Sequence, residues 1–263
     1  MDSLSIALVL GSGLVSGALG FAIAGSFLAI LLFIVTGGYI LGTQRFGYSD
    51  LLRYGLHNAS GAGLNDMNFG FWEKGESQTI AEASASLSKY MVSAGGNAVT
   101  KANKVLDIGC GRGGQTVRLA QSTKAMIIGL DIDHANITAA RKLVRKDDVK
   151  NVSFIQGDAC SLPFPDNSFD VVTSLESAFH YPCKEAFLFE VRRVLKPGGK
   201  LLLADIMINP IWLPASLAQD LLCRSIGCPS GPGRDRVALQ ESLDSLEFEY
   251  KIEDITDRTF VPF

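Results

Sequence analysis

The sequence of 263 residues lacks an excess of basic side chains, and it has few of the residues that hold metals. Its 24 lysines and arginines are outnumbered by 27 acidic residues, so no basic surface for nucleic acid is expected. It has only three histidines, and its five cysteines form no C-x-x-C pair of zinc spacing. We therefore expect no metal site, no nucleic-acid partner, and reduced cysteines of the kind found in the cytosol.

Charged side chains are also absent from one long stretch, between Ser5 and Ile40. A cleaved signal peptide fits this stretch poorly, because no basic residue precedes it. Its length of about 36 residues exceeds the ~20 that cross a bilayer once and falls short of two crossings with a turn. We predict a membrane anchor at residues 1–42, as one long tilted transmembrane helix; a re-entrant hairpin near residues 11–20 is the alternative.

Basic residues follow the uncharged stretch and do not precede it. Only Asp2 lies before it, whereas Arg45, Arg53 and Lys74 come after it. This bias predicts a single-pass protein whose catalytic part faces the cytosol, on the endoplasmic reticulum if the cell is eukaryotic. Small residues spaced as in Gly13-x-x-x-Gly17 would also allow two such helices to pack closely, as a homo-oligomer.

The segment from Asp107 to Gly114 points to a nucleoside ligand. Its alternating glycines let the backbone turn tightly and approach a bound molecule. With Asp131, it also fits the dinucleotide pattern G-x-G-x-x-G, so an NAD(P)-binding oxidoreductase is one interpretation. Asp107 would repel a pyrophosphate, however, and would attract the α-ammonium of a methionine moiety. We therefore favour S-adenosylmethionine as the ligand.

Apolar runs alternate with helical stretches through the rest of the chain. Runs at 104–108, 125–131, 152–156, 169–174 and 200–205 predict a doubly wound, Rossmann-like α/β fold with a parallel sheet. Residues 43–99 are expected to form a linker and lid helices, one of them over 78–93, and residues 100–263 the cofactor-binding domain. Ligands of such sheets bind at the carboxyl ends of the strands where the strand order reverses, which places the site at the glycine segment.

Five motifs, in order along residues 103–205, resemble the class I S-adenosylmethionine-dependent methyltransferases. They are Asp107–Gly113, Gly129–Asp131, Gly157–Ala159, Leu162–Phe164 with Phe169–Val172, and Arg193–Gly199. Asn68–Trp72 and Glu176–Tyr181 further resemble the enzymes of sterols, prenylated quinones or tocopherols, and polyketide-type acceptors. The resemblance implies a sheet that ends in an antiparallel seventh strand. No such strand follows residues 247–253, so the last strand is expected to be missing, by truncation or because another element covers the edge.

The resemblance and the strand positions together assign the cofactor contacts. Asp107 is expected to bind the methionine ammonium, directly or through water. Asp131 is expected to accept hydrogen bonds from both ribose hydroxyls. Asp158 would accept from the adenine amino group, and Trp72 would lie over the sulfonium. Asp133 is expected to cap a helix that starts at His134. The remaining predicted contacts are Gly109, Gly111, Gly113, Ile132 and Ala159.

His180 is the candidate catalytic base, because it follows the fourth predicted strand of the domain, where acceptors approach in the family. If residues 176–180 are helical, Glu176 lies on the same face and could orient the imidazole. A packing role for His180 is the alternative. We predict methyl transfer to a lipophilic small molecule at a membrane surface, as in lipid metabolism. A noncatalytic, membrane-anchored scaffold with the same fold is the remaining alternative.

Overall fold

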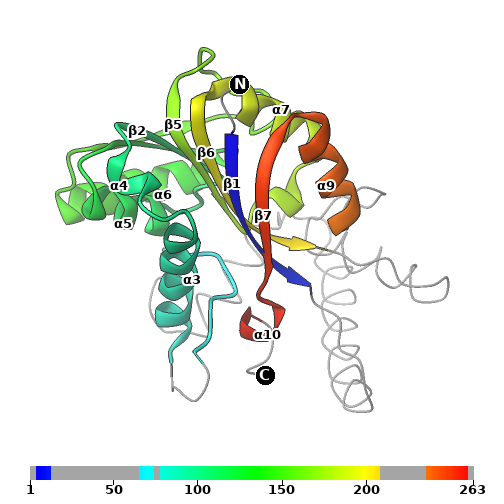
Figure 1. Ribbon diagram of the computed structural model, residues 1–263. Helices are drawn as coiled ribbons and strands as arrows, with labels where there is room; N and C mark the ends of the chain where they lie inside the picture. The colour runs from blue at the N-terminus through cyan, green and yellow to red at the C-terminus, as the bar shows by residue number, and fades with distance from the viewer. Residues whose placement is uncertain (1–3, 13–64, 74–77, 208–234, 260–263) are drawn as a thin grey trace, which may run out of the picture. The chain divides into compact units, whose positions relative to one another are not determined.

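The computed structural model describes residues 4–12, 65–73, 78–207 and 235–259 (Figure 1). Contacts divide the chain into two compact units, one of residues 1–12 with 63–263 and one of residues 13–62. The second unit lies outside the described residues. Residues 65–99, predicted as a linker and lid, belong to the same unit as the sheet.

Seven parallel strands form the sheet, in the order β4-β3-β2-β5-β6-β1-β7. The order reverses between β2 and β5, at the glycine segment, so the predicted doubly wound parallel sheet is confirmed. Four of the five predicted strands match within one residue. The fifth, β6, begins five residues before its predicted start. The strands are β1 Leu4–Ser12, β2 Lys104–Ile108, β3 Met126–Asp131, β4 Val152–Gln156, β5 Phe169–Leu175, β6 Leu195–Met207 and β7 Phe248–Asp254.

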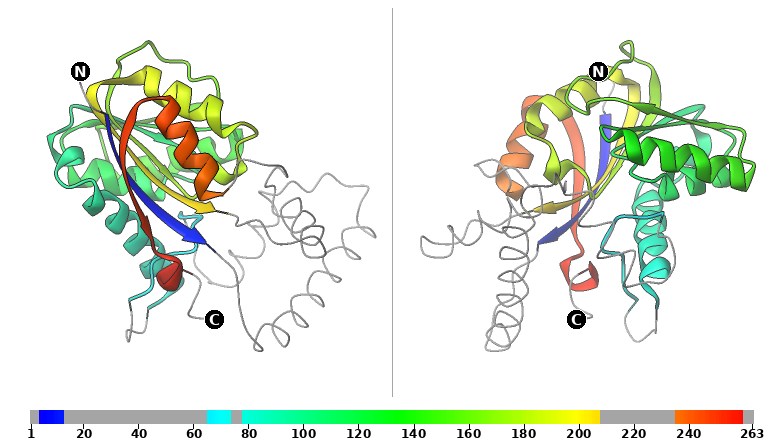
Figure 2. Two further views of the ribbon diagram at one scale, coloured as in Figure 1. Left: turned by 45° about the vertical axis from the view of Figure 1, so that its right-hand side comes forward. Right: turned by 180° about the vertical axis from the view of Figure 1, so that it is seen from behind.

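Helices cover both faces of the sheet (Figures 1 and 2). Helices α3 to α6 pack on one face, and α7 and α9 on the other. Both faces are therefore apolar: Leu202 packs with the α3 layer, whereas Leu201 and Leu203 pack with the α7 layer. The helices are α3 Ile80–Ala94, α4 Ala98–Lys101, α5 Gly114–Ser122, α6 His134–Asp147, the 3-10 helix η1 Ala178–His180, α7 Lys184–Val194, α9 Arg236–Ser245 and α10 Thr256–Thr259.

Local capping explains where two of these helices begin. Thr79 and Glu82 form a reciprocal capping box at the start of α3, which satisfies two backbone N–H groups. Asp133 accepts a hydrogen bond from the Ala135 N–H and begins α6 at His134, as predicted.

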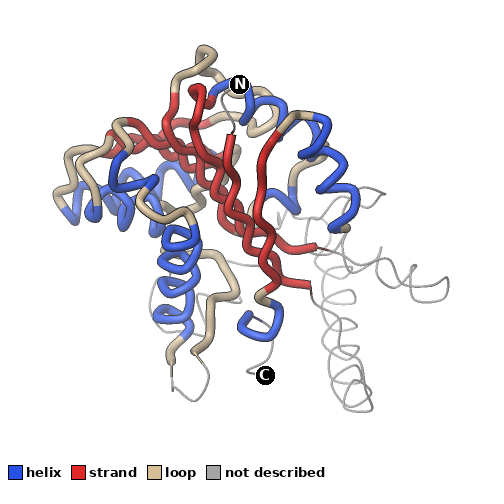
Figure 3. The backbone as a smooth tube through the Cα atoms, in the orientation of Figure 1, coloured by secondary structure: helices blue, strands red, loops and turns tan. Residues whose placement is uncertain are grey.

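Strand β1 corrects the membrane prediction at its N-terminal end. Residues 4–12, predicted to belong to a transmembrane helix, lie between β6 and β7 and run parallel to both (Figure 3). A continuous apolar run suits a strand in the interior of a parallel sheet as well as it suits a membrane helix, which is why the sequence misled. The rest of the predicted anchor, residues 13–42, lies outside the described residues. None of the helices in the described part of the chain is long and apolar enough to cross a bilayer.

The position of β1 also bears on the predicted topology. A single crossing after residue 12 would put β1 on the opposite side of the membrane from β6 and β7, the two strands with which it pairs. The residues that would make such a crossing lie outside the described ones, and the membrane topology of the chain stays a prediction. The place beside β6 that the predicted sheet left empty is filled by β1, which is parallel to its neighbours and comes from the N-terminal end of the sequence. β1 thus pairs the edges that β6 and β7 would otherwise expose.

Replacing Leu8 by proline tests whether β1 belongs to the sheet. Leu8 pairs with Leu203 on one side and Ile252 on the other, so its N–H must serve one of the two ladders. Losing that donor leaves a carbonyl unsatisfied, at about 1–3 kcal/mol. We expect the melting temperature, followed by circular dichroism, to fall by roughly 2–12 °C. Leu8→Val, which keeps the N–H, is the control. A Leu8→Pro protein that melts like the control would exclude residues 4–12 from the sheet.

Candidate active site

The glycine segment turns sharply between β2 and α5. Gly109, Gly111 and Gly113 all have positive φ angles, of 69°, 53° and 87°, and Gly113 is the N-cap of α5. A Cβ at Gly109 would overlap the Ser177 side chain, and a Cβ at Gly113 would lie 2.8 Å from that of Ala140. Only glycine fits at these two positions. At its three glycines the turn therefore presents bare backbone at the carboxyl end of β2.

Asp107 lies beneath this turn and holds it. Its carboxylate accepts hydrogen bonds from Gln115 Nε2 at 2.7 Å, Thr116 Oγ1 at 2.6 Å and Thr173 Oγ1 at 2.7 Å. The residue is 1% exposed, and burial raises the pKa of its carboxyl. Both oxygens are thus committed to α5 and β5. The predicted contact with a methionine ammonium stays a prediction, and this geometry favours a bracing role.

Asp131 and Ile132 lie together at the carboxyl end of β3. Asp131 accepts hydrogen bonds from the N–H groups of Gly111, at 2.8 Å, and Asp133, at 2.9 Å, and burial raises the pKa of its carboxyl. The neighbouring Ile132 side chain is 69% exposed, which is unusual for isoleucine. A carboxylate with two acceptor oxygens beside an uncovered apolar side chain suits a ribose joined to a flat base. These residues therefore fit the predicted nucleoside.

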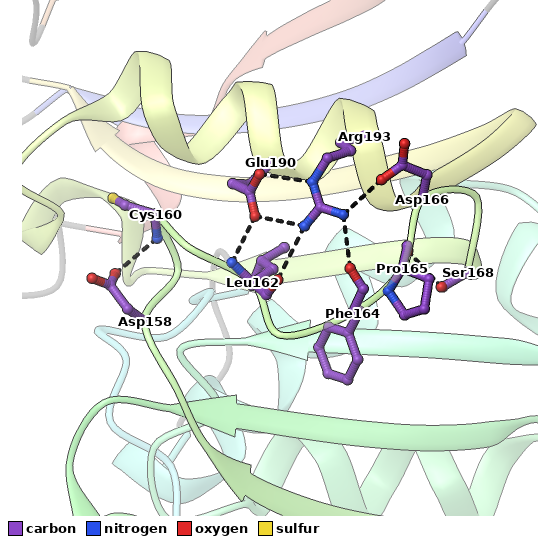
Figure 4. Close-up of polar contacts among 9 residues, drawn as sticks. All are labelled: Asp158, Cys160, Leu162, Phe164, Pro165, Asp166, Ser168, Glu190 and Arg193. Atoms are coloured by element: carbon purple, nitrogen blue, oxygen red, sulfur yellow. Dashed lines mark hydrogen bonds and ion pairs between the residues drawn. The ribbon is translucent and has the colours of Figure 1, made fainter.

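The loop after β4 carries Asp158 and Ala159, the predicted adenine contacts. Asp158 is exposed and accepts the Cys160 N–H at 2.8 Å, whereas Ala159 is buried. Arg193 holds the part of the loop that comes after these two residues, and we call this group of contacts the Arg193 clamp (Figure 4). The guanidinium donates to the carboxylates of Glu190 and Asp166 and to the backbone carbonyls of Leu162 and Phe164. The hydrogen bonds from Arg193 lower the pKa of Glu190. The clamp fixes residues 162–166, the part of the loop that follows Asp158.

Residues 65–73, which we call the strap, lie along the glycine turn. The Asn65 carbonyl accepts the Gly114 N–H at 3.1 Å, and Asp66 forms a two-pronged ion pair with Arg118 at 2.6 and 2.8 Å. Further along, Ser84 Oγ of α3 donates to the Asn68 carbonyl at 3.2 Å. The sequence pattern predicted a lid in this region but gave no sign of the pairing with α5.

Three aromatic residues of the strap have different surroundings. Phe71 is 4% exposed, stacks on Tyr90 at 4.3 Å and lies under the Arg258 guanidinium, so it is a core residue. The Trp72 indole N–H donates to the Phe69 carbonyl at 3.1 Å. Phe69 itself is 52% exposed. Phe69 is thus the aromatic side chain that the strap presents, and the placement of Trp72 over a sulfonium stays a prediction.

The predicted helical pairing of Glu176 with His180 is wrong. Glu176 has φ = +45°, and the 3-10 helix η1 begins only at Ala178, so the two residues do not share a helix face. Glu176 is directed to the strap, where its Oε2 accepts the Phe69 N–H at 2.8 Å. Burial raises the pKa of Glu176 to about 8. His180 is half-buried, with its ring 3.9 Å from that of Phe179, and its catalytic role stays a prediction.

Two groups near the site were missed from the sequence. Lys184 and Asp205 form a buried ion pair at 2.7 Å, and the second Asp205 oxygen accepts the Phe179 N–H at 2.9 Å. Ser177 Oγ donates to the Ile108 carbonyl at 3.2 Å and lies 2.9 Å from the Tyr181 hydroxyl. The position of Asp205 within the apolar run of β6 could have indicated a buried ion pair from the sequence alone. Within the described ranges, no three His, Cys, Asp or Glu side chains form a metal-binding group.

Comparison with known proteins identifies the family. Residues 106–203 match the model of a methyltransferase domain. The 27-O-demethylrifamycin SV methyltransferase of Amycolatopsis mediterranei is 37% identical over 156 residues, 59% of this chain and 56% of that enzyme. The fatty-acid O-methyltransferase of Mycolicibacterium smegmatis is 35% identical over 192 residues, 69% of this chain and 67% of that enzyme. The chain thus spans between about half and two thirds of these relatives.

A solved structure shares most of the fold. The [4+2]-cyclase SpnF matches with a TM-score of 0.64 and 26% identity, over 79% of this chain and 74% of that one. The matched methyltransferase domain runs from β2 into β6 and so contains the glycine turn, Asp131 and Asp158. This match decides between the two nucleoside ligands that the glycine pattern left open. The chain belongs to the S-adenosylmethionine-dependent methyltransferases, and its cofactor is S-adenosylmethionine.

Proposed function

We propose that this methyltransferase acts on a lipophilic small molecule at a membrane surface. The observation that carries the proposal is the half-exposed Phe69 side chain, which the strap presents beside Glu176 at the carboxyl edge of the sheet. An apolar acceptor would cover this ring, and burying apolar surface supplies the binding energy. Relatives that methylate a fatty acid and a demethylrifamycin support acceptors of this kind.

The residues described above would position the cofactor. When bound, S-adenosylmethionine supplies the activated methyl group. Asp131 would accept hydrogen bonds from the ribose hydroxyls, Ile132 and Ala159 would pack on the base, and Asp158 would accept from its amino group. The glycine turn would allow close backbone approach, and Trp72 would face the positive charge. Alignment of the acceptor atom with the methyl group then contributes most to the rate.

His180 would take a proton from a hydroxyl acceptor. It ends η1, whose Phe179 N–H is held by the buried Asp205–Lys184 pair, so the loop that carries the imidazole is fixed to β6 and α7. Glu176 is held by the strap and does not orient the ring through a helix, so His180 would act without it.

Membrane attachment would come from the uncharged stretch that follows β1. Residues 13–40 contain no charged side chain, and Arg45 and Arg53 follow. The residues before this stretch and those after it, from residue 63 on, belong to one unit that contains the sheet. A segment that attaches this unit to a bilayer would therefore enter and leave the bilayer on the same side, as in the re-entrant alternative. Basic residues after the stretch favour the cytosolic side. Small residues such as Gly13 and Gly17 would suit close packing of two copies.

The likeness to a [4+2]-cyclase favours one second candidate, because that protein shares this fold and its name describes another reaction. The chain could then hold the cofactor without transferring its methyl group.

Labelling distinguishes the two candidates. Membranes containing the full-length protein are washed with carbonate, incubated with methyl-labelled S-adenosylmethionine, and extracted for mass spectrometry of the lipids. We expect a labelled lipid. Loss of the protein in the wash would contradict membrane attachment, and intact cofactor binding without any labelled product would favour the second candidate.

Asp131→Asn tests the cofactor contacts. The substitution removes the charge that would strengthen two hydrogen bonds to the ribose, each worth roughly 1.5–3 kcal/mol when charge-assisted. Calorimetry should therefore show at least a tenfold weaker affinity for S-adenosylmethionine. Asp133→Asn is the matched control, because Asp133 caps α6 and an amide oxygen still accepts the Ala135 N–H. Equal affinity in the two variants would remove the ribose role of Asp131.

His180→Ala tests the base. If the labelled product is an O-methyl compound, turnover should fall by roughly 10²–10⁴, the usual contribution of a general base, while the affinity for S-adenosylmethionine stays constant. Added imidazole should restore part of the lost turnover. His134→Ala, at an exposed position on α6, is the control. Full turnover in His180→Ala would leave His180 as a packing residue.

A further inference from the structure

Glu176 is a buried carboxyl group with an incomplete set of partners. It follows β5 and is only 9% exposed. One oxygen, Oε2, accepts the Phe69 N–H of the strap at 2.8 Å. The other oxygen, Oε1, accepts no hydrogen bond from any residue that the structure describes. A largely buried carboxyl group ionises readily only when a cation or several donors surround it, and Glu176 has a single donor among the described residues. Its Oε1 is not among the fully buried atoms without a partner, so a bound molecule can reach it.

The charged groups near Glu176 do not supply the missing partner. From β6, the negative charge of Asp205 opposes ionisation of Glu176. The nearby cation on α7, Lys184, is paired with Asp205 at 2.7 Å. Burial is the largest influence and raises the pKa of Glu176 to about 8, while the hydrogen bond from the Phe69 N–H lowers it. His180 and Tyr181 follow in the same loop; burial raises the pKa of Tyr181, so its phenol stays neutral. At neutral pH the free protein therefore keeps Glu176 mostly protonated.

The position of Glu176 points to the missing partner. The next residue, Ser177, donates to the Ile108 carbonyl and lies against Gly109, so Glu176 is beside the start of the glycine turn. The strap passes over the same place, with Met67 near Gly111 and with Phe69 bonded to Glu176. Asp107, the carboxylate that sequence reasoning chose for the cationic end of the cofactor, already accepts three hydrogen bonds from the protein.

We propose that Glu176 is the carboxylate that meets the positive charge of the methionine half of S-adenosylmethionine, and that it releases its proton to solvent as the cofactor binds. One O–H bond breaks, the proton passes to buffer, and no electrons are transferred. The negative charge then lies against a cation, and the strap, through Phe69, is held to an ionised carboxylate, a stronger acceptor. This inference rests on the S-adenosylmethionine cofactor alone and is independent of the acceptor proposed above.

Proton release can be measured directly on the full-length protein. S-adenosylmethionine and S-adenosylhomocysteine are titrated calorimetrically at pH 7, in phosphate and in Tris, whose ionisation enthalpies differ. With a pKa of about 8 for Glu176, the group is mostly protonated at pH 7, so we expect the larger part of one proton to be released per S-adenosylmethionine bound. Equal release with both ligands would identify the ammonium as the cation, and release with S-adenosylmethionine alone would identify the sulfonium. Binding without proton release would overturn the proposal. Absence of any binding would instead contradict the cofactor itself.

The pH dependence of affinity supplies a second test. Below its pKa, Glu176 must lose a proton for the pair to form, so the affinity for S-adenosylmethionine should rise by up to about tenfold per pH unit from pH 6 to 8 and then level off. Glu176→Gln keeps an acceptor for the Phe69 N–H but carries no charge. Its affinity at pH 8 should be at least tenfold lower than that of the wild type and independent of pH, without proton release.

Glu241→Gln makes the same substitution at an exposed position on α9 and should behave like the wild type. Thermal unfolding of both variants shows whether each is folded. A folded Glu176→Gln protein that releases protons as the wild type does would contradict the role of Glu176.

Discussion

A single buried carboxylate, that of Asp107, fixes the geometry on which the site depends. Its three donors come from α5 and from β5, so one side chain joins the strand before the glycine turn, the helix after it and the neighbouring strand. Removing a donor would leave part of a buried charge uncompensated, which costs more free energy than an ordinary hydrogen bond provides. The turn is therefore held from below, and Gly111 can offer its N–H to Asp131 above it.

The rim of the site is assembled from distant parts of the chain. The strap is bonded to α5 through Asp66 and to the loop after β5 through Phe69, while Trp72 exchanges hydrogen bonds with Arg258 of α10. The matched methyltransferase domain, residues 106–203, includes neither the strap nor α10. The residues proposed to hold the nucleoside thus lie in the shared domain, and the rim lies in segments outside it.

Local signals were sufficient for much of this structure. The strands of the cofactor domain were predictable because each is a short apolar run bounded by turn residues, and the Asp133 cap because it depends on neighbours in sequence. The surroundings of Asp107 were not predictable, since Thr173 meets it from 66 residues away. The predicted pairing of Glu176 with His180 failed because Glu176 has a positive φ angle, which no residue of a right-handed helix has, and the sequence did not signal this angle. β1 was misread because its apolar run resembles a membrane segment.

The pairing of β1 has a consequence for how the protein is made. Leu8 is synthesised long before its partners Leu203 and Ile252. Its ladder therefore joins residues about two hundred positions apart, and contacts of such separation form slowly because a long loop must close first. Until β6 and β7 have been synthesised, β1 has no strand to pair with, and an unpaired apolar segment is prone to aggregation. β1 therefore takes its place in the sheet only after the strands on both sides of it have been synthesised.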